Sequence, residues 1–184
     1  MSHEPVDTAE HQTETQIFGG PLTQVLPAIE THKIGRLVSI INKDTMIETP
    51  EVLDNDQHLK LAMNDISEPR DGLVLPSEAH VERLIDFVDE WDMKHHMLVH
   101  CWAGVSRSTA GVFISLCRLN EETDEITIAE ALRKASPTAT PNIKLVGLAD
   151  DLMGRQGRMV DAVTMIGQGE MAFEGAVFSM PVRF

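Results

Sequence analysis

Cysteine is scarce in this sequence of 184 residues, which contains only Cys101 and Cys117. Two cysteines in different sequence contexts exclude the framework of disulfides that staples small secreted domains. Long apolar runs are also missing, and no segment approaches the roughly 20 apolar residues of a membrane-spanning helix. The polar, acidic start of the chain has no apolar run behind a basic stretch, so it does not resemble a secretory signal. We therefore expect a protein of a reducing compartment, the cytoplasm.

Basic residues are few, because 15 Lys and Arg face 29 Asp and Glu and give a formal net charge of −14. A surface this negative repels nucleic acid and anionic lipid, so neither nucleic acid nor a membrane is expected as a partner. It also repels phosphorylated substrates at long range. Any anion site must therefore be local and built from a few well-placed donors.

The length of the chain fits one domain, which can bury a core without disulfides or a structural metal. Residues 1–15 are polar and are predicted to be a flexible N-terminal tail. Residues 156–184 show no clear periodicity of apolar residues. They are predicted to be a C-terminal extension, with extended chain from about residue 160. The main domain is expected over residues 16–155.

Within the main domain, short apolar runs alternate with amphipathic segments. Buried strands are predicted at 36–41, 59–63 and 97–100. Helices are predicted from Leu22 to Ile29, at 77–94 with Ser77 as N-cap, from about 107, at 125–135 and at 141–154. This alternation predicts a three-layer α/β fold in which helices flank a central, mostly parallel sheet.

The segment that carries chemistry is Cys-Trp-Ala-Gly-Val-Ser-Arg-Ser at 101–108. Strand 97–100 would deliver Cys101 to the carboxyl edge of the sheet, where open α/β folds place their ligand crevices. The helix that begins at about Arg107 would aim its positive end at the same place. The guanidinium of Arg107 is planar, and its paired N–H donors suit a tetrahedral oxyanion. The loop contains small residues that let backbone N–H groups converge on one point: Ala103, Gly104 and Ser106.

The same groups act on the thiol of Cys101. Helix N-termini and nearby cations favour the ionised form of a cysteine, so we expect a thiolate at neutral pH. The loop would then bind a phosphate dianion above a nucleophile. In-line attack would form a phosphocysteine, while the loop amides and Arg107 stabilise the charge on the equatorial oxygens.

A leaving alkoxide needs a proton, so an acid is expected upstream of the loop. Asp65 directly follows strand 59–63. If that strand were a parallel neighbour of the Cys101 strand, Asp65 would lie at the same sheet edge as general acid, and later as base to a hydrolytic water. Asp71 on the following loop is the alternative, and position along the chain favours Asp65.

The segment from His100 to Ser108, in which five residues separate Cys101 from Arg107, resembles the signature loop of the cysteine-based protein tyrosine phosphatases. Within that superfamily the chain is most similar to small, single-domain, bacterial-type dual-specificity phosphatases, over roughly residues 16–155. The resemblance implies a protein tyrosine phosphatase-like fold, a phosphatase catalytic domain over these residues and hydrolysis of phosphate monoesters without a cofactor. No segment resembles the phosphotyrosine-recognition loop of the larger tyrosine-specific enzymes, which implies a shallow pocket.

The resemblance also implies a role for each matching residue. Cys101 would be the nucleophile and Arg107 the phosphate clamp, while Ser108 would hydrogen-bond the sulfur and help it leave. His100 would brace the loop from behind, and Asp65, in Met-Asn-Asp, matches the place of the family's acid. The phosphate-binding loop would comprise Trp102, Ala103, Gly104, Val105, Ser106 and Arg107.

The expected partners are a phosphorylated protein or a small phosphate ester, with inorganic phosphate or vanadate as ligands of the loop. Two other functions stay open: a phosphoprotein-binding module without turnover, and a rhodanese-like sulfurtransferase, which also places a cysteine in a loop before a helix. The Arg-Ser ending and the upstream Asp favour phosphoryl chemistry. His95 and His96 have no acid or cysteine at ligand spacing, so no metal site is expected. Cys117, on the apolar side of a helix, is expected in the core.

Overall fold

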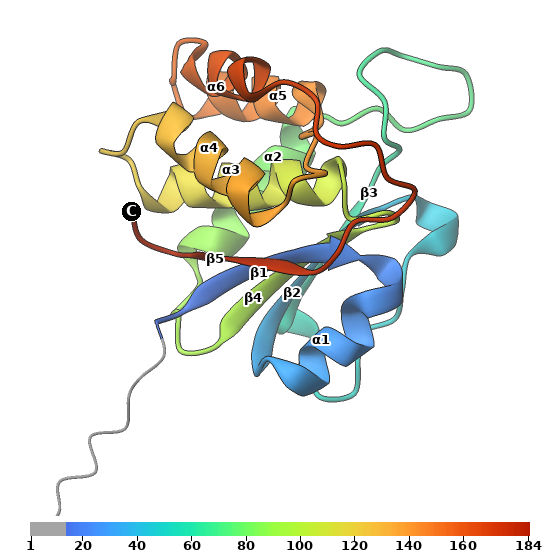
Figure 1. Ribbon diagram of the computed structural model, residues 1–184. Helices are drawn as coiled ribbons and strands as arrows, with labels where there is room; N and C mark the ends of the chain where they lie inside the picture. Colours follow the sequence, from blue (N-terminus) through green and yellow to red (C-terminus); the bar gives the residue numbers. More distant parts are fainter. Residues whose placement is uncertain (1–13) are drawn as a thin grey trace, which may run out of the picture.

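A five-stranded sheet crosses the middle of the molecule (Figure 1). The computed structural model describes residues 14–184. The strands follow the order β3-β2-β4-β1-β5, and all neighbours are parallel except β5, which pairs antiparallel with β1. They are β1 (Gln16–Pro21), β2 (Ile34–Ile41), β3 (His58–Ala62), β4 (His96–Cys101) and β5 (Phe178–Pro181). The predicted mostly parallel central sheet is confirmed.

The central strands β2 and β4 are buried on both faces. Every side chain of β2 from Leu37 to Ile41 is buried, and so is every side chain of β4 from Met97 to Cys101. Apolar, mostly branched side chains on both faces fit the interior of a parallel sheet covered by helices. The strands predicted at 36–41, 59–63 and 97–100 are therefore confirmed, each to within two residues.

Helices cover both faces of the sheet and complete three layers (Figure 1). On one face, α1 (Val25–Thr31) packs against Leu37 and Leu98 in a small core cluster. The opposite face carries α2 (Glu78–Asp89), α3 (Arg107–Leu119), α4 (Glu125–Ala135), α5 (Ile143–Leu152) and α6 (Arg158–Ile166). These helices share a larger core with the sheet, and α3 is buried at each position from Arg107 to Cys117. The predicted three-layer α/β fold is confirmed.

Helix α2 begins where the sequence predicts but ends earlier. Ser77 is its N-cap, and Nδ1 of His80 accepts a hydrogen bond from the Ser77 N–H at 3.2 Å. The helix ends at Asp89 rather than at residue 94. Met93 has a φ of 56°, which a right-handed helix excludes, and Trp91 instead donates its indole N–H to the His95 carbonyl at 3.1 Å.

The C-terminal residues are not uniformly extended. Helix α6 occupies Arg158–Ile166, so the prediction of extended chain from about residue 160 is wrong for this part. Its first turn is capped from a distance, because the Asp150 carboxylate on α5 accepts the N–H groups of Gly157 at 2.6 Å and Met159 at 2.7 Å. A cap from another helix leaves no local start signal in the sequence.

Strand β1 was not predicted, and its sequence explains why. Ile17 and Phe18 are followed by Gly19, Gly20 and a proline, which are weak strand formers. Gly19 nevertheless makes room for β5, because a Cβ there would lie 2.3 Å from the ring of Phe178, which would have to shift. The predicted tail, residues 1–15, lies outside the described residues except for its last two.

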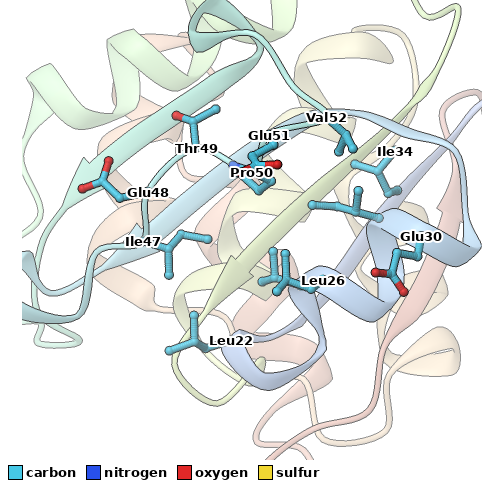
Figure 2. A pocket seen from close by; sticks show the side chains of 12 residues that line it. Leu22, Leu26, Glu30, Ile34, Ile47, Glu48, Thr49, Pro50, Glu51 and Val52 are labelled. Carbon is cyan, nitrogen blue, oxygen red and sulfur yellow. The ribbon is translucent and has the colours of Figure 1, made fainter.

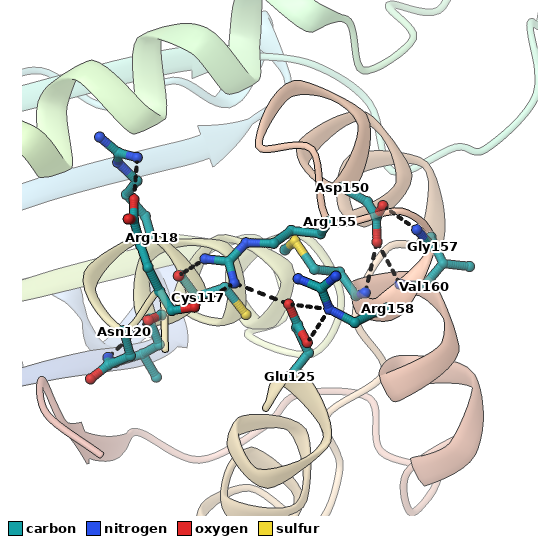
Figure 3. Close-up of polar contacts among 12 residues, drawn as sticks. Cys117, Arg118, Asn120, Glu125, Asp150, Arg155, Gly157, Arg158 and Val160 are labelled. Atoms are coloured by element: carbon teal, nitrogen blue, oxygen red, sulfur yellow. Dashed lines mark hydrogen bonds and ion pairs between the residues drawn. The ribbon is translucent and has the colours of Figure 1, made fainter. Parts of the chain in front are cut away.

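A buried ionic cluster ties the helical layer together (Figure 3). Glu125 and Arg155 are 4% and 6% exposed, and Arg155 Nη1 donates to Glu125 Oε1 at 3.1 Å. Burial raises the pKa of Glu125, but its hydrogen bond to Arg158 and the charges of Arg158 and Arg155 outweigh burial and lower the pKa overall. Cys117 is buried beside this cluster, and burial raises the pKa of its thiol. The predicted core position of Cys117 is confirmed.

Candidate active site

Strand β4 carries Cys101 to the carboxyl edge of the sheet. Because β4 lies between β1 and β2, its last residue emerges in the middle of the molecule. Cys101 is only 2% exposed, so its sulfur lies at the floor of a cavity of about 330 Å³. The cavity is lined by Asn42, Asp65, Cys101, Trp102, Ala103, Val105, Ser106, Arg107 and Ala172.

The loop after Cys101 directs hydrogen-bonding groups at the sulfur. The Gly104 N–H donates to Cys101 Sγ at 3.3 Å, and Ser108 Oγ lies in a hydrogen bond 3.2 Å from the same sulfur. Helix α3 begins at Arg107, so its positive end faces the cavity. Such donors stabilise both a negatively charged sulfur and a bound oxyanion.

The loop takes this shape because residue 104 is glycine. Gly104 has a φ of +72°, and a Cβ there would lie 2.6 Å from the backbone nitrogen of Pro21 at the end of β1. A side chain is therefore excluded by both conformation and space. The Leu22 N–H also donates to the Trp102 carbonyl at 3.1 Å. The unpredicted strand β1 thus holds the predicted loop in place.

Arg107 is fixed by two protein acceptors and keeps donors for a ligand. Its Nη1 donates to Asn42 Oδ1 at 2.8 Å and to the Met63 carbonyl at 2.8 Å. The side chain is 5% exposed, and within residues 14–184 its buried Nε has no hydrogen-bond partner. A buried guanidinium N–H that faces a cavity is a suitable donor for an oxyanion.

Asp65 also reaches the cavity, but not by the predicted route. Strand β3 pairs with β2 and not with the Cys101 strand β4, so the expectation of a direct neighbour is wrong. The chain continues beyond β3, and Asp65 Oδ1 accepts the Ser106 hydroxyl at 2.8 Å and the Asn142 Nδ2 at 2.7 Å. The Asn142 side-chain oxygen meanwhile caps α5. Two residues distant in sequence therefore hold this carboxylate beside the loop.

Asp71 lies elsewhere, on the exposed loop that projects beyond β3 in Figure 1. Asn64 and Val74 close this loop at its base, with the Asn64 N–H donating to the Val74 carbonyl and the Val74 N–H to Asn64 Oδ1, both at 2.8 Å. Asp71 does not belong to the cavity lining. The geometry therefore brings Asp65, and not its alternative, to the cavity that Cys101 lines.

A chain of buried side chains lies behind the loop. Ser39 Oγ is hydrogen-bonded to His100 Nε2 at 2.6 Å and to His58 Nε2 at 2.8 Å, and His58 Nδ1 is hydrogen-bonded to Thr49 Oγ1 at 3.1 Å. His100 Nδ1 lies 3.3 Å from the Cys101 carbonyl. His100 is fully buried and outside the cavity lining, which fits a brace behind the loop. Burial lowers the pKa of His100 and of His58 to about 4.

We expect these two imidazoles to make the fold sensitive to acid. Their native pKa values of about 4 lie below the ordinary value of 6.5, so the unfolded chain takes up protons first as the pH falls through that interval. The free energy of unfolding should be independent of them above about pH 6.5 and should decline toward pH 4, by up to about 3 kcal/mol for His100. Urea unfolding at pH 7 and pH 5, with NMR titration of both rings, measures this.

The variant His58→Gln is the control for this prediction, because it removes one titrating ring while keeping a polar side chain beside Ser39. It should show a smaller loss of stability between the two pH values. A His100 ring that titrates near pH 6.5 in the folded protein would contradict the prediction.

A second, larger cavity of about 720 Å³ lies between α1 and residues 47–52 (Figure 2). Its walls are mostly apolar, with Leu26 and Val52 exposed. The charged groups that line it are carboxylates, those of Glu30, Glu48 and Glu51, and these would repel a phosphate ester. The cavity above Cys101 is therefore the candidate for anion chemistry.

Two features are absent from residues 14–184. No cluster of three or more His, Cys, Asp and Glu side chains is arranged to hold a metal ion there. No helix in that part of the chain has the length and apolar character to cross a bilayer.

The order of the strands and the cysteine loop between β4 and α3 place the chain in the protein tyrosine phosphatase-like fold class. The sequence itself matches no protein-family model and no curated protein. Comparison with solved structures, by contrast, finds small dual-specificity phosphatases and their relatives. The predicted phosphatase-like fold is therefore confirmed.

Three of these structures illustrate the likeness. DUSP15 superposes with a TM-score of 0.58 over 84% of this chain and 94% of its own, at 18% identity. A human tyrosine phosphatase-like serine/threonine/tyrosine-interacting protein has a TM-score of 0.60 over 76% and 92%, at 19% identity. PTPMT1 in complex with PI(5)P has a TM-score of 0.56 over 82% and 93%, at 12% identity.

Sequence reasoning missed three residues of the site. Asn42, which follows β2, positions Arg107, and Asn142 positions Asp65. Ala172 of the C-terminal extension forms part of the cavity wall. Asn142 had a local signal, because an Asn between a proline and an amphipathic helix is a typical N-cap. Asn42 and Ala172 carry no local signal, since their roles depend on chain segments that meet only in the folded protein.

Proposed function

We propose that this protein hydrolyses phosphate monoesters through a phosphocysteine at Cys101. The observation that carries the proposal is the sulfur at the floor of the cavity, with the Gly104 N–H directed at it and the Arg107 side chain in the cavity wall. This combination supplies a nucleophile and the donors for a tetrahedral oxyanion at one place.

In the first step, the Cys101 thiolate attacks phosphorus and forms the S–P bond while the P–O bond to the leaving group breaks. The Arg107 guanidinium and the loop N–H groups bind the equatorial oxygens. Asp65, in its protonated form, gives its proton to the leaving oxygen. Its contacts with Ser106 and Asn142 support this role, because they hold the carboxyl group in the cavity wall.

In the second step, a water molecule attacks the phosphocysteine. Asp65, now a carboxylate, takes a proton from the water, and the S–P bond breaks to release inorganic phosphate. Ser108 Oγ, 3.2 Å from the sulfur, stabilises the thiolate as it leaves. The protonation state of Asp65 after each cycle is the one with which it began.

We propose phosphorylated proteins as the substrates, with phosphotyrosine or phosphoserine and phosphothreonine as the reacting residues. Inorganic phosphate and vanadate would bind as ligands. PTPMT1 binds a phosphoinositide, but the net charge of −14 disfavours an anionic membrane surface and nucleic acid here. A thiolate nucleophile needs a reducing compartment, which supports a cytoplasmic location.

Hydrolysis of an aryl phosphate tests the proposal. We expect turnover that vanadate inhibits, without added metal. A phosphoprotein-binding module would bind phosphate without turnover, as the likeness to a phosphatase-like interacting protein allows. A sulfurtransferase would instead convert cyanide with thiosulfate, and that result would reject phosphoryl chemistry.

Replacement of Asp65 by alanine should slow substrates with poor leaving groups far more than substrates with good ones. General acid catalysis contributes about 10²–10⁴-fold, so we expect a loss of this size with an alkyl or phenyl phosphate and a much smaller loss with a nitrophenyl phosphate. Steady-state kinetics with a series of leaving groups measures the difference.

Asp71→Ala is the matched control, because Asp71 is an exposed carboxylate outside the cavity lining. It should keep the wild-type dependence on the leaving group. If Asp71→Ala shows the steep dependence and Asp65→Ala does not, the acid role belongs to Asp71.

A further inference from the structure

The C-terminal extension contributes a segment to the mouth of the catalytic cavity. This rim segment, residues 168–175, belongs to the red chain that descends from α6 to β5 past the ends of the central strands in Figure 1. The Glu170 N–H donates to the Pro137 carbonyl at 2.9 Å, and the Gly175 N–H donates to the Ala103 carbonyl at 2.8 Å. Ala172 lies between these two anchors and forms part of the cavity wall.

The rim segment is packed closely against the phosphate loop. A Cβ at Gly169 would lie 2.5 Å from the backbone of Thr138, and one at Gly175 would lie 3.1 Å from the Gly104 carbonyl oxygen. The residues that contact the rim segment, Pro137 and Thr138, are close in the chain to Thr140, whose N–H donates to the Val105 carbonyl of the Cys101 loop at 2.9 Å. Because the rim segment is already fixed, it loses little conformational entropy when a substrate binds, and binding is more favourable.

Two large apolar side chains of the rim segment are exposed to solvent next to Ala172, which lines the cavity. Met171 and Phe173, on either side of Ala172 in the chain, are 102% and 92% exposed, and Trp102, which also lines the cavity, is 52% exposed. Single exposed apolar residues are common, but several next to the wall of a candidate active site favour contact with a substrate. Here the backbone contacts at both ends of the rim hold Met171 and Phe173 out of the core.

The charge of the protein makes such a contact useful. With a net charge of −14, the protein gains no long-range attraction for a phosphorylated partner. The rim has two carboxylates of its own, Glu170 and Glu174, and the Glu174 carboxylate accepts the Thr23 hydroxyl at 3.0 Å. Affinity beyond the phosphate must therefore come from contacts at short range, which exposed apolar side chains can supply.

We propose that the rim segment is a subsite for an apolar side chain next to the phosphorylated residue of a protein substrate. Met171 and Phe173 contact that side chain while the phosphate lies above Cys101. The inference rests on the proposed hydrolysis and adds the specificity that the phosphate loop alone does not supply.

The double variant Met171→Ala, Phe173→Ala tests the subsite. Both side chains are exposed, so folding should be preserved. The substrates are two phosphotyrosine peptides that differ only in flanking residues, leucine in one and glycine in the other. The wild-type protein should prefer the leucine peptide in kcat/KM by about tenfold or more, mainly through KM. The double variant should lose this preference, whereas Met165→Ala, an exposed methionine on α6 outside the cavity lining, should keep it.

Three other outcomes overturn one proposal or the other. Equal kcat/KM for both peptides in the wild-type protein overturns the subsite and leaves the hydrolysis intact. A preference that survives in the double variant assigns it to other residues and also overturns the subsite. If the wild-type protein fails to hydrolyse an aryl phosphate, the proposed function is wrong. The subsite is then judged by peptide affinity of the Cys101→Ser protein, and equal affinities for the two peptides reject it.

Discussion

Replacement of Cys101 by serine is expected to lower the hydrolysis of an aryl phosphate by at least about 10⁴-fold. The serine hydroxyl is un-ionised at neutral pH and is a poor nucleophile toward phosphorus. The donors around the site, Gly104 N–H and Arg107, do not depend on the sulfur, so binding of inorganic phosphate should be retained. Turnover kinetics and calorimetric titration with phosphate measure the two effects separately.

Cys117→Ala provides the matched control. Cys117 is fully buried in the core and lies on the far part of α3 from Cys101, ten residues after the helix begins at Arg107. Its loss should cost about 1 kcal/mol of stability and leave turnover unchanged. If Cys101→Ser keeps activity within about tenfold of wild type, the phosphocysteine mechanism is wrong.

Replacement of Arg107 by lysine is expected to lower kcat/KM for aryl phosphates by about 10³-fold. The loss of one preorganised donor lowers the rate by about 10²–10³-fold, and the Arg107 guanidinium supplies more than one such donor. Lysine keeps the positive charge but places its donors on a single nitrogen. It cannot contact Asn42 and the Met63 carbonyl while also presenting two parallel donors to phosphate. The affinity for inorganic phosphate should fall as well, as titration of the variant would show.

Arg133→Lys separates catalysis from stability. Like Arg107, Arg133 has a buried Nε without a partner in the described residues, and its other nitrogens donate to the carbonyls of Ala139, Ile166 and Gly167. It lies outside the cavity lining, so the variant should lose stability and keep kcat/KM for an aryl phosphate. If Arg107→Lys behaves in the same way when both variants are folded, Arg107 is structural only.

The loop around Cys101 could be predicted because its parts are local. Cys101, the donors of the loop and Arg107 lie within eight consecutive residues, 101–108, on a strand, a tight turn and the start of a helix. Each of these elements has a local signal: a buried apolar run, a glycine where φ is positive, and a helical period. The sequence therefore specified both the residues and the place where they meet.

The position of Asp65 was harder to predict. The sequence favoured Asp65 on the assumption that its strand borders the Cys101 strand, and that assumption was wrong because β2 lies between them. Asp65 reaches the cavity through contacts with Ser106, 41 residues away, and with Asn142, 77 residues away. Asp65 thus lies at the cavity, as predicted, but through contacts other than the predicted strand pairing.

By itself, the sequence determined the layered α/β fold, its central strands and the loop around Cys101, because these follow from hydrophobic period and turn chemistry within short windows. Only the tertiary structure decided how Asp65 is held, that α6 is a helix capped from α5, and that the rim segment contributes Ala172 to the cavity wall. These features depend on hydrogen bonds and close contacts between segments that are tens of residues apart. No local pattern encodes such contacts, because they exist only once the sheet and the helical layer have packed together.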